Sequence, residues 1–150
     1  MGSDQIERMK VRIKRIDKSL PLPAYETDGA VAFDLICRQE TTVQPCQIAR
    51  IPANVIVEVP EGYMLMISLR SSTPVRFGLL IPHGVGIIDN DYCGEGDEIR
   101  IQVFNFTDKP VTIPRGARIA QATFVKIEKA SWQEVESTGR RTRGGFGSTG

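Results

Sequence analysis

The sequence predicts an all-β protein, and three observations lead to that prediction. Apolar and polar residues alternate in several short segments, which is the period-two pattern of half-buried strands. Proline, glycine and aspartate cluster between these segments, as they do in turns. No long stretch keeps the apolar stripe of an amphipathic helix. Many short strands at regular spacing are typical of a β-sandwich or barrel.

Six segments are predicted as strands. The alternation is rough in the first of them, where Val11, Ile13 and Ile16 are interleaved with basic residues, and clearer in the others. The predicted strands cover residues 11–16, 48–51, 55–59, 63–69, 99–104 and 118–125. Turn signals lie between them at residues 60–62, 108–110 and 114–116.

Length, charge and cysteine content limit the classes of function. A chain of 150 residues with 41% hydrophobic residues is long enough for one domain with a full core. A net charge of +1 argues against a surface built to bind nucleic acid, although a local basic site remains compatible with it. No apolar stretch is long enough to cross a bilayer. The odd set Cys37, Cys46 and Cys93 lacks a zinc-site pattern, and we expect reduced thiols in a cytoplasmic protein.

The end of the chain, residues 144–150, combines glycines with the parts that bind a nucleotide. Phe146 can stack on a base, and the preceding Arg140, Arg141 and Arg143 can each hold phosphate oxygens in a fork. A disordered polar terminus explains the same residues, and from the tail alone the two interpretations are about equal.

A second informative stretch runs from Gly84 to Gly94. A hairpin tip would explain Asn90, Asp91 and Gly94, since these residue types favour turns. It explains Asp89 poorly, because Asp89 directly follows an apolar run, where we expect it to be partly buried. A carboxylate in such a place suits a general base that activates a water molecule.

Residues 69–74 place Arg70 beside three hydroxyl side chains, Ser71, Ser72 and Thr73, at the end of a predicted strand. This group could hold phosphate. Taken alone, a turn or a helix start that is capped by Ser72 or Thr73 is the favoured interpretation, by about two to one.

These segments, with two others, resemble the five motifs of the homotrimeric deoxyuridine triphosphatases (dUTPases), in the same order. The resemblance covers nearly the whole chain, and the third and fifth motifs are highly specific. In this chain the motifs correspond to residues 29–35, 70–72, 86–94, 116–121 and 144–150.

The resemblance implies a jelly-roll-like, distorted β-barrel that forms a homotrimer with active sites shared between subunits. Residues 1–137 would be the β domain and residues 138–150 a flexible arm that closes an active site. The implied reaction is hydrolysis of dUTP to dUMP and pyrophosphate. It would use Mg²⁺ that is held mainly by the substrate phosphates and water, with no metal-binding side chains. The resemblance implies neither direct binding of nucleic acid nor association with a membrane.

The resemblance also implies the chemistry of the reaction. Asp89 would orient and deprotonate the water that attacks the α-phosphorus, and Asp34 would support the site. Tyr92 would pack flat against the deoxyribose and leave no room for a 2′-hydroxyl. Gln121 would hold phosphate and help to position the water. Further phosphate contacts would come from Arg70, Ser71 and Ser72.

Base recognition and closure are implied for the hairpin and the tail. The hairpin from His83 to Ile88 would bind uracil mainly through backbone groups of Gly84, Val85, Gly86 and Ile88. Phe146 would stack on the base, and the γ-phosphate would be held by Arg141 or Arg143 with Gly147, Ser148 and Thr149. We prefer Arg141 of the two arginines, because its spacing to Phe146 matches the commoner form of the motif.

The chain departs from the usual motifs at three places. Many family members have asparagine where His83 stands, which makes backbone recognition of uracil the expected mode. Leu69-Arg70-Ser71-Ser72 replaces the common Pro-Arg-Ser-Gly, and residues 95–97 look like a short insertion.

Two alternatives remain open. One is a dCTP deaminase, or a bifunctional dCTP deaminase/dUTPase, of the same fold. Deaminases of this fold use a glutamate as general base where this chain has Gln102, and an amide cannot take that role. The other alternative is a non-catalytic nucleotide-binding trimer, which would keep the fold and lose parts of the site.

Overall fold

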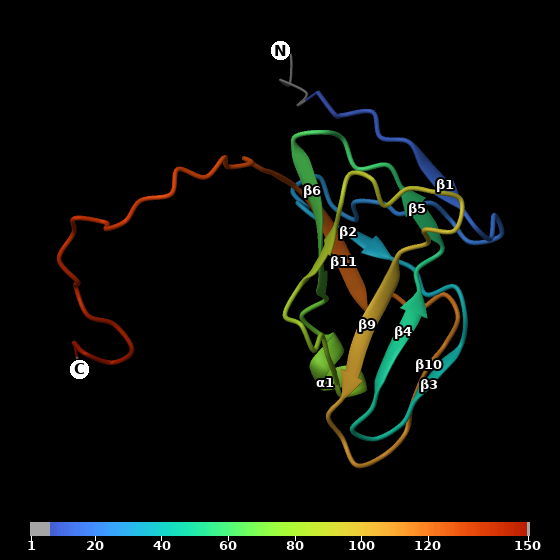
Figure 1. Cartoon of the computed structure of the whole chain (residues 1–150). Helices are drawn as coiled ribbons and strands as arrows, with labels where there is room; N and C mark the ends of the chain where they lie inside the picture. Colours follow the sequence, from blue (N-terminus) through green and yellow to red (C-terminus); the bar gives the residue numbers. More distant parts are fainter. Residues whose placement is uncertain (1–6, 150) are drawn as a thin grey trace.

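A computed structural model describes residues 7–149 of the chain. Within these residues it contains eleven short strands and one short helix (Figure 1). In chain order they are β1 (Ile13–Arg15), β2 (Phe33–Leu35), β3 (Thr41–Val43), β4 (Ile48–Pro52), β5 (Val55–Val57), β6 (Tyr63–Leu69), α1 (Thr73–Phe77), β7 (Leu79–Leu80), β8 (Gly86–Ile88), β9 (Arg100–Asn105), β10 (Val111–Ile113) and β11 (Ala120–Lys126). The prediction of an all-β fold is confirmed.

The largest sheet brings four of the five motif segments together. Its strand order is β2-β11-β6-β8, and all its pairings are antiparallel. The long strands β6 and β11 form its centre, with Leu69 opposite Ala120 at one end and Tyr63 opposite Lys126 at the other. The first and third motifs supply the two edge strands, β2 and β8.

A second sheet, in the order β4-β9-β7, and two ribbons, β1-β5 and β3-β10, complete a distorted jelly-roll-like barrel. The core draws on strands of both sheets, because the alternation in β6 and β9 turns every second side chain inward. Its fully buried side chains include Leu35, Ile51, Leu65, Ile101 and Val103.

The observed strand bounds differ from the predicted ones by one or two residues at most ends, and the first strand is only Ile13–Arg15. The sequence did not predict β2, β3, β7 or β10. Each of these has only two or three residues, which is too short for alternation to register.

The chain after β11 leaves the barrel. Figure 1 shows this segment, in orange and red, running away from the sheets. Residues 127–149 contain no helix or strand. The predicted boundary at residue 137 therefore lies inside an extended segment that begins directly after β11. Residues 1–6 and Gly150, which belong to the predicted domain and arm, lie outside the described residues. No helix among residues 7–149 is long and apolar enough to cross a membrane.

Candidate active site

A cavity of about 310 Å³ opens between the hairpin of residues 83–88 and the second sheet. It brings together four predicted site residues from the third motif, Gly86, Ile88, Asp89 and Tyr92, and the neighbouring His83. The wall also includes residues that the motif analysis did not single out as site residues, namely Arg50, Ile67, Ile81, Ile87, Arg100, Ile101 and Gln102.

The expectation that Asp89 is partly buried is wrong for the single chain, since its side chain is exposed. The reason is topological: β8 is an edge strand, so the chain that leaves it after Ile88 faces solvent and not the core. Asp89 nevertheless lines the cavity, where a carboxylate can reach a bound molecule.

The next residue, Asn90, anchors this turn to the barrel. Its amide nitrogen donates toward the carbonyl oxygens of Val59, Pro60 and Tyr63 at 3.1, 2.8 and 2.8 Å. Val59 and Pro60 belong to the turn that connects β5 and β6, and Tyr63 is the first residue of β6. Turn propensity alone therefore does not account for Asn90, because its side chain holds the chain directly after Asp89 in place.

Tyr92 is held from behind by a buried acidic residue. Its hydroxyl donates to the carbonyl oxygen of Glu98 at 3.2 Å. The Glu98 carboxylate accepts two hydrogen bonds from Arg38, from Nε at 2.7 Å and from Nη2 at 2.9 Å. The backbone N–H of Asn54 donates to it at 2.9 Å. The hydrogen bond to Glu98 raises the pKa of Arg38 above its usual value.

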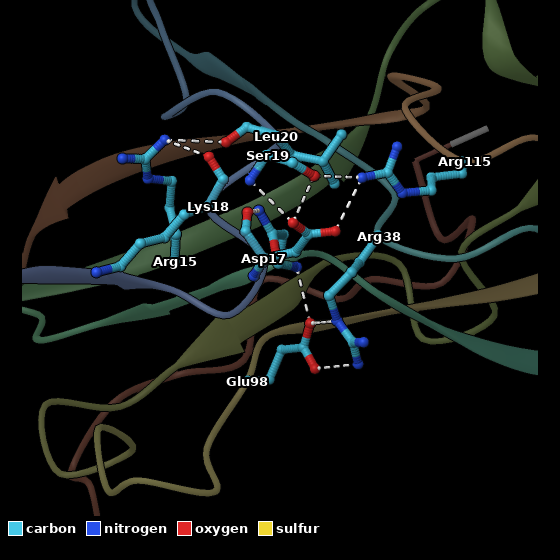
Figure 2. A network of polar contacts seen from close by, with 9 residues as sticks. Arg15, Asp17, Lys18, Ser19, Leu20, Arg38, Glu98 and Arg115 are labelled. Carbon is cyan, nitrogen blue, oxygen red and sulfur yellow. Dashed lines mark hydrogen bonds and ion pairs between the residues drawn. The ribbon is translucent and has the colours of Figure 1, made fainter.

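The same network continues to the edge of the barrel (Figure 2). The side chain of Asn54 and the backbone of Asp17 exchange two hydrogen bonds, at 2.7 and 3.0 Å. Ser19 and Arg115 both donate to the Asp17 carboxylate, and they hold its pKa well below the usual range. The turn before the fourth motif is thereby tied to the segment that follows β1.

A second group of predicted residues gathers on the large sheet, apart from the cavity wall. Asp34 of β2 lies opposite Gln121 of β11, and Arg70 Nε is 3.5 Å from Asp34 Oδ1. Arg70 Nη1 also donates to the carbonyl oxygen of Arg118 at 3.2 Å. Gln121 Nε2 donates to Ser68 Oγ at 3.3 Å. This group, the Asp34–Arg70–Gln121 cluster, presents amide and guanidinium donors suited to phosphate.

The turn after Arg70 combines features of both interpretations of this segment. A helix does begin there, and Ser72 is its N-cap residue, but the Ser72 side chain makes no capping hydrogen bond. Thr73 is buried instead, and its hydroxyl donates to the carbonyl oxygen of Ile119 at 2.6 Å. Ser71 and Ser72 are exposed beside the Asp34–Arg70–Gln121 cluster.

The remaining predicted residues are not brought to either group. Gly84 and Val85 form the exposed turn of the hairpin. The tail residues Arg141, Arg143, Phe146, Gly147, Ser148 and Thr149 are exposed, and the Phe146 ring is fully so. Residues 139–149 make only local hydrogen bonds, such as that from Gly145 N to Ser148 Oγ at 2.7 Å.

Some functional candidates were missed because their partners are distant in sequence. Arg38 is 60 residues from Glu98, and Arg50 is 52 residues from Gln102. The pairing of Arg50 with Gln102 could be predicted only from the register of β4 and β9, in which the two residues lie opposite each other. Among residues 7–149, no group of three or more His, Cys, Asp or Glu side chains could hold a metal ion.

Comparison with known proteins identifies close relatives over nearly the whole chain. A model of the dUTPase family matches residues 18–150. The deoxyuridine 5′-triphosphate nucleotidohydrolase of Dictyoglomus turgidum is 39% identical, over 95% of this chain and 99% of that protein. The protein of the same name from Hydrogenobaculum is 37% identical over the same shares.

Solved structures agree with this assignment of fold. The dUTPase of Streptococcus mutans is 28% identical, with a TM-score of 0.73 over 80% of this chain and 98% of that one. The dUTPase of Staphylococcus bacteriophage 80alpha in complex with dUPNHPP is 23% identical, with a TM-score of 0.82 over 94% of this chain and 98% of that one. A mutant dUTPase from phage phi11 of S. aureus, with a TM-score of 0.76 at 20% identity, coordinates a structural Mg(II) ion.

Proposed function

This chain belongs to the dUTPase family, and we propose that it hydrolyses dUTP to dUMP and pyrophosphate. This reaction would limit incorporation of uracil into DNA and supply dUMP for thymidylate synthesis. The observation that carries the proposal is the cavity that Asp89 and Tyr92 share with Gly86 and Ile88 of the hairpin. A general base (Asp89), a surface for the sugar (Tyr92) and backbone groups for a pyrimidine (Gly86 and Ile88) then line the same cavity.

In the proposed mechanism Asp89 accepts a proton from the water that attacks the α-phosphorus. Its exposure at the cavity supports this role, because the carboxylate can reach a water bound beside the substrate. Tyr92, fixed through Glu98, supports the deoxyribose. Phosphoryl transfer requires alignment and charge neutralisation more than covalent help from the protein.

The Asp34–Arg70–Gln121 cluster supplies the phosphate contacts, with Ser71 and Ser72 beside it. Asp34 orients the Arg70 guanidinium from 3.5 Å, and Gln121 can turn its amide to a phosphate oxygen or to the attacking water. We propose Mg²⁺ as cofactor, and its contribution would be to neutralise charge on the triphosphate. The ion would be held mainly by phosphate oxygens and water, beside the guanidinium and amide donors of Arg70 and Gln121.

We further propose a homotrimer in which each site combines residues of different subunits. The separation of the cavity from the Asp34–Arg70–Gln121 cluster supports this arrangement, as does a tail that extends away from its own barrel (Figure 1). Residues 138–150 would act as the arm that closes a site, with Phe146 on the base and Arg141 or Arg143 on the γ-phosphate. The three free thiols fit the reducing cytoplasm, where we propose that the enzyme works.

The first test is a comparison of dUTP, dCTP, dTTP and UTP, with and without Mg²⁺, with the products separated by chromatography. We expect dUMP and pyrophosphate from dUTP and little turnover of the other three nucleotides. Deamination of dCTP would favour the deaminase alternative, which the amide of Gln102 argues against. Binding of a dUTP analogue without turnover of dUTP would favour the non-catalytic trimer.

Shared sites can be tested with mixed trimers. Asp89→Asn and Arg70→Ala each disable every site in a pure trimer. If one site takes Asp89 and Arg70 from different subunits, trimers assembled from both variants regain part of the activity. If both residues act within one chain, the mixture stays as inactive as the separate variants. Light scattering of the active protein reports the assembly directly, and an active monomer would refute the trimer.

A further inference from the structure

Three polar side chains form a chain along the wall of the cavity. Arg50 and Gln102 face each other across β4 and β9, and Arg50 Nε donates to Gln102 Oε1 at 2.9 Å. On its other side, Gln102 Nε2 lies 3.4 Å from His83 Nδ1. All three residues line the cavity that contains Asp89 and Tyr92.

The order of hydrogen-bond donors along these three side chains determines which imidazole nitrogen carries the proton. Arg50 can only donate, so the amide atom that faces it must be the oxygen of Gln102. The amide nitrogen of Gln102 then faces His83, and it too can only donate. His83 Nδ1 must therefore accept, and a neutral His83 carries its hydrogen on Nε2.

The protonated nitrogen lies over the hairpin at a glycine. A Cβ atom built on Gly86 would lie 3.8 Å from His83 Nε2 and only 3.2 Å from the Cβ of Ile67. A side chain at position 86 would crowd Ile67 and cover the imidazole nitrogen. With glycine there, no side chain at position 86 covers the Nε2–H group.

We propose that the Arg50–Gln102–His83 chain fixes His83 as an Nε2–H donor toward the cavity, and that this donor selects bases with a carbonyl at ring position 4. Uracil presents an acceptor there, whereas cytosine presents an amino group, which would set donor against donor. The choice of base rests on the proposed function, but the position of the proton does not. His83 then adds a side-chain contact to the backbone recognition that the hairpin was expected to provide.

The position of the proton can be read directly, because His83 is the only histidine of the chain. A long-range ¹H–¹⁵N spectrum separates the two neutral tautomers of the imidazole from each other. We expect the Nε2–H form in the unchanged protein. Gln102→Glu keeps the shape and lets one carboxylate oxygen accept from Arg50 and the other from His83 Nδ1–H, so the tautomer should invert. Arg100→Gln makes the same change in charge on the cavity wall and should leave the tautomer unchanged.

Selectivity is the second measurement, as the ratio of kcat/KM for dUTP to that for dCTP. His83→Ala should lower turnover of dUTP by about 3–10-fold, the range for one neutral hydrogen bond. Gln102→Glu should lower the dUTP:dCTP ratio by at least about tenfold, because an unprotonated Nε2 faces the carbonyl and accepts from the amine instead. In the His83→Ala background, Gln102→Glu should change the ratio less than about twofold, since its effect passes through the imidazole.

An Nδ1–H tautomer in the unchanged protein would overturn the inference. So would an equal effect of Gln102→Glu on the ratio with and without His83. These failures differ from a failure of the proposed function, in which the unchanged protein would not hydrolyse dUTP at all.

Discussion

Removal of the positive partner of Glu98 should destabilise the protein far more than removal of a similar ion pair at the surface. Arg38→Met keeps much of the length of the side chain and deletes both hydrogen bonds to the Glu98 carboxylate. The Glu98 side chain is only 9% exposed and that of Arg38 24%. After the substitution the carboxylate keeps the N–H of Asn54 as its one remaining donor.

The expected loss in free energy of unfolding is about 3 kcal/mol. Leaving one charge of a buried pair without its partner costs about 3–5 kcal/mol, and the lower end applies because Arg38 is partly open to water. For a domain of this size such a loss corresponds to a fall in Tm of roughly 6–12 °C. Tyr92 should also lose part of its fixed position, since its hydroxyl bonds to the backbone of Glu98.

The assay is denaturant unfolding at one fixed protein concentration, because assembly changes apparent stability. Arg12→Met is the matched control, since Arg12 and Glu58 form an ion pair at 3.1 Å with side chains 88% and 47% exposed. The control should lose less than about 1 kcal/mol. Arg38→Met combined with Glu98→Gln should recover part of the loss, because a neutral amide replaces the stranded charge. If Arg38→Met costs no more than the control, the reasoning about the buried pair is refuted.

Four further outcomes follow from the site, the tail and the core. Asp89→Asn should keep the fold and the binding of a dUTP analogue and lose about a hundredfold or more of turnover, and near-normal rates would remove Asp89 from the mechanism. Truncation after Gly139 should leave Tm nearly unchanged, because the lost residues as far as Thr149 make only local hydrogen bonds, and should sharply reduce dUTP hydrolysis. Phe146→Ala should weaken binding of the dUTP analogue by roughly 1–3 kcal/mol. Phe146→Trp should restore most of that binding and give a fluorescence change when the analogue binds. Full activity of the truncated protein would show that the tail is a disordered end. Burial raises the pKa of the Cys37 thiol to about 12. The stability that the buried thiol contributes is therefore full below pH 9 and is lost as pH rises from 9 toward 12. An equally steep alkaline fall in the stability of Cys37→Val would contradict this.

The all-β class and the longest strands were available from the sequence, because a strand with one buried face repeats its pattern every two residues. Residues 63–69 show this alternation, and they form β6 with the predicted bounds. The contiguous residues 86–94 also stood out, since a motif carries its residue types and spacing with it. Neighbours in sequence stay neighbours in space, which is why Asp89 and Tyr92 could be expected on one short segment.

Tertiary structure decided the contacts between residues that are far apart in the chain. Strand register placed Arg50 opposite Gln102 and Asp34 opposite Gln121, and no local pattern contains that information. The edge position of β8 left Asp89 exposed, against the expectation from its apolar neighbours. The sequence around Glu98 does not indicate that Arg38 is its partner, because the two side chains meet only in the folded barrel. Local periodicity therefore determines which elements form, whereas register and burial determine which side chains meet.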